Sequence, residues 1–288
     1  MVRKILYAAV ALVAFACSAQ RSGDVPLPSV PSELREPQVR ADYIIEHFWD
    51  NADTLGAYKR NALEQAFSNF ISVFPVASDT ARQKAMKALV QKASSGHDGL
   101  VAVAEIADIY LYNVDSPIAS EEYYILFLQE LMESDALSED EKIRPAYQLS
   151  NALRNRPGDL AADFSFDTRE GLHTSLYDEI DRLASGQKLA LIFYDPDCSH
   201  CRKLLDKLLK YRADFAGLTF VAVYSGDDRP MWQDAAGELP SDWIVGYDDG
   251  TMQEEDTYII RTLPTIYVIA PDKTVLVKEA TLDDLLDQ

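Results

Sequence analysis

Cysteine is scarce in this sequence of 288 residues, which contains only Cys17, Cys198 and Cys201. Small exported domains that depend on disulfides for their stability carry several pairs, so a disulfide-scaffold fold is excluded. Two of the three cysteines lie three positions apart and the third is close to the N-terminus. The small number therefore makes the task of each cysteine a separate question.

Basic residues are also few, with 27 Lys and Arg against 47 Asp and Glu, a net charge of −20. A surface of this sign repels phosphate backbones, so nucleic acid is excluded as a partner. The hydrophobic fraction of 48% rules out wholesale disorder. At about 150 residues per domain, the length predicts two domains.

A long apolar run is missing from the N-terminus. Arg3 and Lys4 precede about a dozen apolar residues, too few for a membrane span of about 20, which predicts a signal peptide over residues 1–16. The following segment, Ala14-Phe15-Ala16-Cys17, resembles a bacterial lipobox, although Leu is usual three positions before the cysteine. The resemblance implies that Cys17 is lipidated. An ordinary signal peptide is the alternative, and both interpretations predict export.

Residues 17–37 contain Pro26, Pro28 and Pro31 and show no apolar periodicity, so we expect a lipidated N-terminus followed by an extended linker. From 38 to 157 the apolar spacing is helical, as at Met86, Leu89, Val90 and Ala93, or at Ile143, Ala146, Tyr147, Ser150 and Leu153. Breaks at Pro75, Gly96, Pro117 and Pro157 predict five or six helices in an all-α domain. No catalytic pattern is present there.

The pattern changes over residues 158–288 to strands alternating with helices. The apolar runs 188–194, 218–224, 265–269 and 275–278 predict buried strands, in the order β-α-β and then β-β-α. Cys198-Ser199-His200-Cys201 lies between the first of these strands and an amphipathic helix. At a helix N-terminus Cys198 would be a stabilised thiolate, and Cys201, one turn further, would resolve a mixed disulfide.

These residues resemble the thioredoxin superfamily, and most closely the TlpA/ResA-like periplasmic thiol–disulfide oxidoreductases. The resemblance rests on three segments: 162–176, 192–201 and 260–269. It implies a thioredoxin-like α/β fold, a central mixed sheet flanked by helices. It also implies a cis Pro264 against the Cys198 sulfur, a Leu263 backbone that pairs with substrate, and an insert over 227–258. The helical domain resembles a domain of unknown function in some Gram-negative lipoproteins.

The sequence departs from the family pattern at two places. Ile192 stands where thioredoxin keeps a buried acid, which leaves the proton acceptor of Cys201 unidentified. Asp197 replaces the usual Trp before the motif, and with Asp195 it should disfavour the Cys198 thiolate, whereas His200 should favour it. Ser199 and His200 are the expected redox-tuning residues, and the direction of electron flow stays open.

The predicted function is that of an exported, lipid-anchored thiol–disulfide oxidoreductase that faces the periplasm of a Gram-negative bacterium. Its expected partners are protein thiols or disulfides of the cell envelope and an upstream membrane electron donor or acceptor. No cofactor or metal is expected beyond the redox-active Cys198–Cys201 pair. Three alternatives remain: a structural disulfide, a metal site at Cys198, His200 and Cys201, and a redox-dormant scaffold whose helical domain binds a protein.

Overall fold

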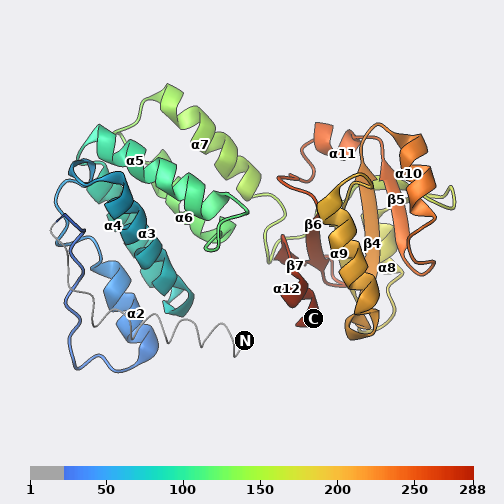
Figure 1. Cartoon of the computed structure of the whole chain (residues 1–288), viewed down its shortest axis with the longest axis horizontal. Coiled ribbons are helices and arrows are strands. Elements are labelled where there is room, and N and C mark those ends of the chain that lie inside the picture. Colours follow the sequence, from blue (N-terminus) through green and yellow to red (C-terminus); the bar gives the residue numbers. More distant parts are fainter. Residues whose placement is uncertain (1–22) are drawn as a thin grey trace. The chain divides into compact units, whose positions relative to one another are not determined.

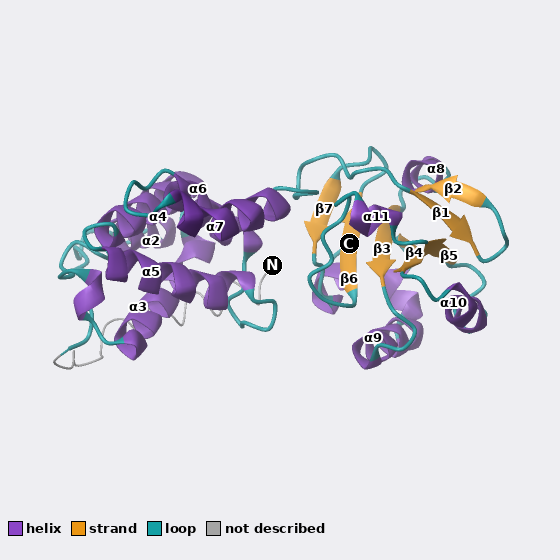
Figure 2. Cartoon of the chain, turned by 90° about the horizontal axis from the view of Figure 1, so that it is seen from above, coloured by secondary structure: helices purple, strands orange, loops and turns teal. Residues whose placement is uncertain are grey.

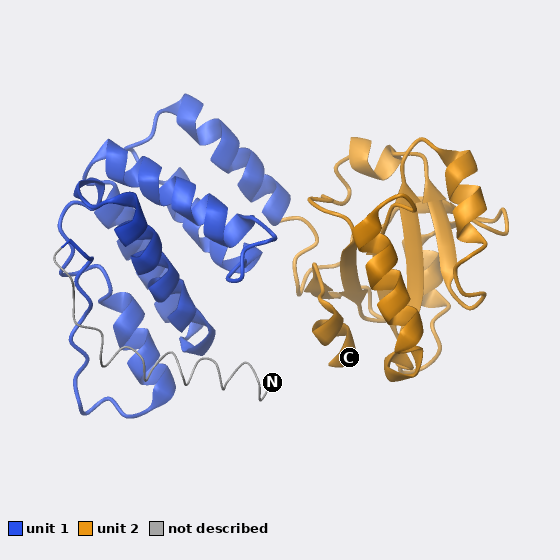
Figure 3. Cartoon of the chain, in the orientation of Figure 1, with its two compact units in different colours: residues 1–152 blue, residues 153–288 orange. Residues whose placement is uncertain are grey.

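The computed structural model describes residues 23–288 (Figure 1). The chain forms two compact units, Met1–Ala152 and Leu153–Gln288 (Figure 3), and each unit has its own hydrophobic core. The predicted signal peptide and Cys17 lie outside the described residues. Between residues 23 and 288, no helix is both long and apolar enough to cross a bilayer.

Unit 1 is helical, as predicted. Its described part contains six α-helices, with short 3₁₀ or π turns between some of them. The α-helices are α2 (Pro37–Glu46), α3 (Arg60–Val73), α4 (Asp79–Ala93), α5 (His97–Ala107), α6 (Glu121–Met132) and α7 (Glu139–Ala152). The short turns are η1 (Leu55–Ala57), η2 (Phe74–Val76) and η3 (Asp108–Tyr112).

Local chemistry explains where several of these helices begin and how they pack. The Ser78 hydroxyl accepts the N–H of Ala81 at the start of α4, and the Ser120 hydroxyl does the same for Tyr123 at α6. Apolar side chains spaced by three or four positions, such as Phe67, Phe70 and Phe74, fill the core between the helices. The periodicity of the sequence therefore identifies most of the buried positions of this unit.

Helix α7 is an exception to this agreement. The predicted apolar stripe forms a helix, but Ile143 and Tyr147 are 66% and 61% exposed. The helix packs instead through polar residues, because the buried Gln148 accepts a hydrogen bond from the Tyr124 hydroxyl at 3.0 Å and donates to Asp108 at 2.6 Å. This polar network decides which face of α7 is buried.

Unit 2 is built on one mixed sheet of seven strands in the order β2-β1-β5-β4-β3-β6-β7. Strands β3, β4 and β5 are parallel to one another, and the remaining pairs are antiparallel. The strands are β1 (Ser165–Thr168), β2 (His173–Ser175), β3 (Lys188–Phe193), β4 (Leu218–Ser225), β5 (Ile244–Asp248), β6 (Thr265–Ile269) and β7 (Val275–Lys278). The helices are α8 (Leu176–Asp181), α9 (Ser199–Lys210), η4 (Arg212–Phe215), α10 (Arg229–Ala236), α11 (Thr251–Glu254) and α12 (Leu282–Leu286).

Helices cover both faces of the sheet, with α9 and α10 on one face and α8 on the other (Figure 2). We call the cluster under α9 and α10 the thiol-side core, because it contains Cys201 together with Ile192, Tyr194 and Trp232. The opposite cluster, the far-side core, contains Leu191, Phe193 and Tyr258. The alternation along β3 sends Ile192 and Tyr194 to one core and Leu191 and Phe193 to the other, as expected for a central strand with both faces buried.

The strand order predicted from the sequence was incomplete, because β5 was not predicted. This strand lies inside the expected insert, and it pairs with β4 on one side and β1 on the other. It is only five residues long and contains Gly246, which weakens a strand signal. Gly246 is required by packing, since a Cβ at this position would lie 2.5 Å from Cδ2 of Phe166.

Candidate active site

Strand β3 and helix α9 position the two cysteines of unit 2. The chain leaves the sheet after Phe193, and Cys198 is the N-cap of α9. The Cys198 N–H donates to the Asp195 carbonyl at 3.1 Å, which holds the loop turned toward the helix. Both cysteines are free thiols, so the structure describes the dithiol form. Cys198 is half-buried, whereas Cys201 is fully buried.

The surroundings of Cys198 favour the ionised form of its thiol. Burial opposes its ionisation, but hydrogen bonds from the Cys201 and His200 N–H groups and from the Cys201 thiol outweigh burial and lower its pKa. The Cys201 N–H lies 3.5 Å from the Cys198 sulfur, the usual geometry of an N-cap acceptor at a positive helix end. The negative charge of Asp195 opposes the thiolate. Cys198 is therefore the more acidic thiol of the pair.

Cys201 differs from Cys198 in both its burial and its pKa. Its sulfur is 0% exposed, and burial raises the pKa of its thiol to about 12. The Asp195 N–H donates to this sulfur at 3.5 Å and favours the thiolate, but the nearby Cys198 and the Asp195 carboxylate oppose it. Two thiols with pKa values on opposite sides of the ordinary cysteine value suit successive tasks of attack and resolution.

The loop before β6 contacts Cys198. The Leu263–Pro264 peptide bond is cis, as the resemblance implied, and the Cys198 thiol donates to the Leu263 carbonyl oxygen at 3.7 Å. Tertiary structure thus brings Cys198, Cys201, Leu263 and Pro264 together. Whether Leu263 and Pro264 position a substrate stays a prediction.

Ser199 and His200 are exposed on the first turn of α9. Within the described chain the His200 imidazole makes no hydrogen bond or ion pair, and His200 acts on Cys198 through its backbone N–H. That contact is available to any residue at position 200 except proline. The predicted tuning by the side chains of Ser199 and His200 stays a prediction.

Two residues near the thiols escaped the sequence analysis. Tyr194 follows β3 and Trp232 lies on α10, and both are buried in the thiol-side core. The Tyr194 hydroxyl and the Trp232 indole nitrogen have no hydrogen-bond partner among the described residues. In the sequence, Tyr194 is the last residue of an apolar run that predicts a strand. Only its position four residues before Cys198 could have indicated that it lies near the thiols.

Each of the other three histidines lies beside a carboxylate. His47 binds Asp50 and His97 binds Glu141, both at 2.7 Å, while His173 binds Asp167 at 3.0 Å. Over residues 23–288, no group of three or more His, Cys, Asp or Glu side chains is arranged to hold a metal ion.

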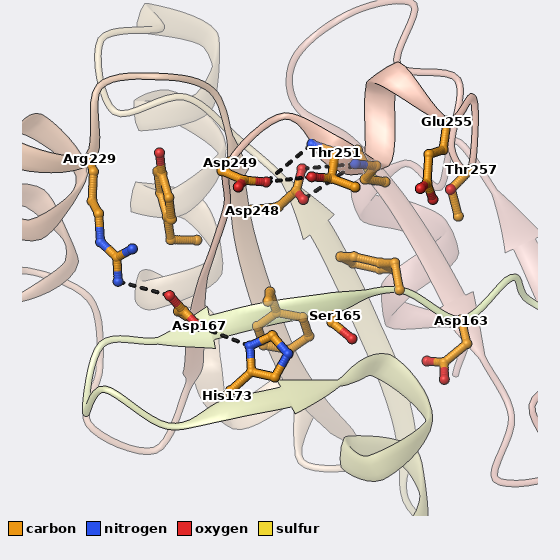
Figure 4. Close-up of a pocket in the computed structure, with 14 residues that line it drawn as sticks. Asp163, Ser165, Asp167, His173, Arg229, Asp248, Asp249, Thr251, Glu255 and Thr257 are labelled. Atoms are coloured by element: carbon orange, nitrogen blue, oxygen red, sulfur yellow. Dashed lines mark hydrogen bonds and ion pairs between the residues drawn. The ribbon is translucent and has the colours of Figure 1, made fainter.

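A separate hollow of about 470 Å³ lies between the β1–β2 hairpin and α11 (Figure 4). Its polar side chains are engaged with one another, since Asp167 binds both His173 and Arg229, at 3.0 and 2.9 Å. The buried Asp248 carboxylate accepts bonds from the Ser225 hydroxyl and from backbone N–H groups at the start of α11. These carboxylates stabilise the fold, and nothing in the hollow indicates a ligand.

Two known families match the chain. The domain of unknown function DUF5106 matches residues 12–155, which is half of the chain, and the thioredoxin-like domain matches residues 178–286. No protein of curated function matches the sequence.

Solved structures resemble one or both units. A thioredoxin-like protein from Bacteroides caccae is 28% identical with a TM-score of 0.85, and the match covers 93% of this chain and 98% of that protein. A conserved protein of unknown function from Bacteroides fragilis is 34% identical over 46% of this chain and 97% of its own, with a TM-score of 0.41. The thioredoxin domain of a thiol-disulfide oxidoreductase from Bacteroides vulgatus is 26% identical over 46% and 94%, with a TM-score of 0.40.

The two family matches and the likeness to the Bacteroides caccae protein agree with the architecture of both units, and they confirm the predicted fold class and the predicted resemblance. The chain belongs to the DUF5106 family, and it joins the helical domain of that family to a C-terminal thioredoxin-like domain.

Proposed function

We propose that this protein is a thiol–disulfide oxidoreductase that acts through Cys198 and Cys201. The observation that carries the proposal is the asymmetry of the pair. The accessible Cys198 has a lowered pKa at the N-terminus of α9, while the buried Cys201 has a raised pKa one turn further on. A disulfide exchanger needs one thiol that attacks and a second that stays protonated until it is required.

In the reducing direction, the Cys198 thiolate attacks one sulfur of a substrate disulfide. The substrate S–S bond breaks, its other sulfur leaves as a thiolate and takes up a proton, and a mixed disulfide forms. Cys201 then loses its proton and attacks the Cys198 sulfur, which releases the second substrate sulfur. Two electrons pass to the substrate, and Cys198 and Cys201 become a disulfide. The oxidising direction is the reverse sequence.

The proposed partners are protein thiols or disulfides of the cell envelope. An extended substrate segment would pair with the backbone at Leu263, beside the sulfur that it must reach. An upstream membrane electron donor or acceptor would restore the starting state of Cys198 and Cys201 after each turnover.

The proposed location is the cell envelope of a Gram-negative bacterium, facing the periplasm, with a lipid on Cys17 as the anchor. This proposal rests on the apolar leader, the lipobox-like segment and the linker in the sequence. It is tested by the Cys17→Ser variant, which should move the protein from the membrane fraction to the soluble fraction. If the variant stays as firmly membrane-bound as the wild type, the lipid anchor is wrong.

The enzymatic proposal is tested by reduction of insulin disulfides with dithiothreitol as the electron source. The purified full-length protein should accelerate the reaction, and Cys198→Ser should abolish the acceleration. Cys201→Ser should instead accumulate mixed disulfides in cells, and these would identify the physiological substrates. A wild type that is no faster than Cys198→Ser, together with redox-independent co-purification of an envelope protein, would favour the scaffold alternative.

A further inference from the structure

Two buried polar groups in the thiol-side core have no task in the fold. The Tyr194 and Trp232 side chains belong to residues that are 3% and 2% exposed, and neither Oη of Tyr194 nor Nε1 of Trp232 has a hydrogen-bond partner between residues 23 and 288. A buried donor without a partner costs about 1–3 kcal/mol, so native proteins rarely retain one without a reason. Two such groups in the core that contains Cys201 need an explanation.

Backbone and ring contacts hold the two side chains in the core. Tyr194 extends β3 directly, and its N–H donates to the Val223 carbonyl at 3.1 Å. Trp232 lies on α10, and its ring packs on Tyr247 with a centroid separation of 5.3 Å. The side chains of Ile192, Tyr194, Cys201 and Trp232 lie in the thiol-side core.

Electrostatics link the two groups to Cys201. Burial is the largest cause of a Tyr194 pKa well above its usual range, and the nearby charges of ionised Cys201 and of Asp195 raise it further. The Trp232 indole N–H approaches the Tyr194 hydroxyl closely enough to lower this pKa, although it does not reach hydrogen-bond geometry. Tyr194 therefore stays protonated, and its O–H is available as a donor.

Cys201 is the group that needs a donor. Burial raises the pKa of its thiol to about 12 in the dithiol form, yet resolution requires its thiolate. The Asp195 N–H is a single stabilising contact, and the neighbouring Ile192 of the thiol-side core is apolar and cannot donate a hydrogen bond from its side chain.

We propose that the Tyr194 hydroxyl, supported by the Trp232 indole N–H, stabilises the Cys201 thiolate while Cys201 attacks the mixed disulfide. This inference rests on the proposed function. In the step concerned, Cys201 loses its proton to water and its sulfur bonds to the sulfur of Cys198. The bond from Cys198 to the substrate breaks, and the substrate thiolate leaves and takes up a proton. Tyr194 directs its O–H dipole at the developing charge and remains protonated, so it is a positioning residue.

The test uses DTNB, an aromatic disulfide that releases a coloured thiolate. Attack by Cys198 on DTNB releases the first coloured thiolate, and attack by Cys201 on the resulting mixed disulfide releases the second. We expect Tyr194→Phe to leave the first phase unchanged and to slow the second about two- to tenfold, the scale of one hydrogen bond. The pH profile of the second phase should also shift to higher pH, because Cys201 ionises less readily.

A stability measurement separates this role from a structural one. Because the Tyr194 hydroxyl is buried without a partner, Tyr194→Phe should unfold at the same or a higher urea concentration than the wild type. The matched control is Tyr258→Phe in the far-side core, whose hydroxyl donates to the Ala162 carbonyl at 2.8 Å. That variant should unfold at lower urea concentration and keep both DTNB phases.

The outcomes are distinct. An unchanged second phase in Tyr194→Phe, or a loss of stability equal to that of Tyr258→Phe, overturns the role of Tyr194 and leaves the enzymatic proposal intact. The absence of the first phase in the wild type overturns the proposed function itself. A slower second phase with unimpaired stability supports the role that we infer.

Discussion

The Cys198 thiol donates to the carbonyl oxygen of Leu263 at 3.7 Å, although 65 positions separate the two residues in the sequence. This hydrogen bond exists only while Cys198 is protonated, because a thiolate has no proton to donate. When Cys198 ionises, the Leu263 carbonyl oxygen therefore loses this hydrogen-bond donor at the same time as the thiolate forms. We propose that the released oxygen is free to pair with the backbone of a substrate.

Alkylation should distinguish the two thiols. With iodoacetamide we expect labelling of Cys198 to accelerate as pH rises and to level off above its lowered pKa, since only the thiolate reacts. Cys201 should stay unlabelled in the folded protein, because it is 0% exposed and its pKa is about 12. Peptide mass spectrometry after timed labelling measures both rates. Equal labelling of the native protein would contradict the asymmetry, and labelling in urea is the control that both thiols can react.

Removing the charge of Asp195 should make Cys198 more acidic. The carboxylate raises the pKa of Cys198, so Asp195→Asn should increase the thiolate fraction below that pKa. We expect about two- to fivefold faster alkylation at mildly acidic pH, the scale of one partly exposed charge interaction. The N–H that Asp195 donates to Cys201 is retained in the variant. Asp197→Asn is the control, and an equal effect there would show that the general charge of the loop matters rather than Asp195.

Arg169 should be important for the stability of unit 2 and unimportant for its nucleophile. Its side chain is 15% exposed, and the guanidinium donates to four backbone carbonyls at 2.7–3.1 Å. The acceptors are Ala236, Leu239, Pro240 and Trp243.

Lysine has no planar fork of donors, so Arg169→Lys should lose about 2–4 kcal/mol of unfolding free energy. Urea unfolding followed by tryptophan fluorescence measures the loss, and the rate of Cys198 alkylation in the folded variant should be unchanged. A loss below about 0.5 kcal/mol would show that the stability of the segment 236–243 does not depend on the hydrogen bonds from Arg169.

Gly99 should be indispensable to the packing of unit 1. A Cβ at Gly99 would lie 2.9 Å from the backbone nitrogen of Gly56 and 3.3 Å from the carbonyl oxygen of Ala93, so η1 and α5 would have to separate. We expect Gly99→Ala to lower the unfolding free energy by about 1–3 kcal/mol. Gly96→Ala is the matched control, because its nearest neighbour would be a methyl group at 3.7 Å. Equal stability of the two variants would contradict the close backbone approach.

Much of the fold follows from local patterns. The strands at 265–269 and 275–278 were predicted to the residue, because continuous apolar runs bounded by polar residues can be buried in few other ways. Strand β5 was missed because its five residues include a glycine and a terminal aspartate, and its strand conformation depends on β4 and β1. Tertiary contacts also decide the orientation of α7: the sequence predicted this helix but not the face that it buries.

The sequence by itself determined that Cys198 and Cys201 lie where a buried strand passes into a helix. Two cysteines at a strand–helix junction were enough to predict the nucleophile and the resolving thiol, because the polarity of a helix and the spacing of its turns are local properties. Tertiary structure alone decided how far the two thiols differ, since burial of Cys201 and the approach of Leu263 depend on segments distant in the chain. It also decided the positions of Tyr194 and Trp232, because the partners of a buried polar atom are known only when the whole core is assembled.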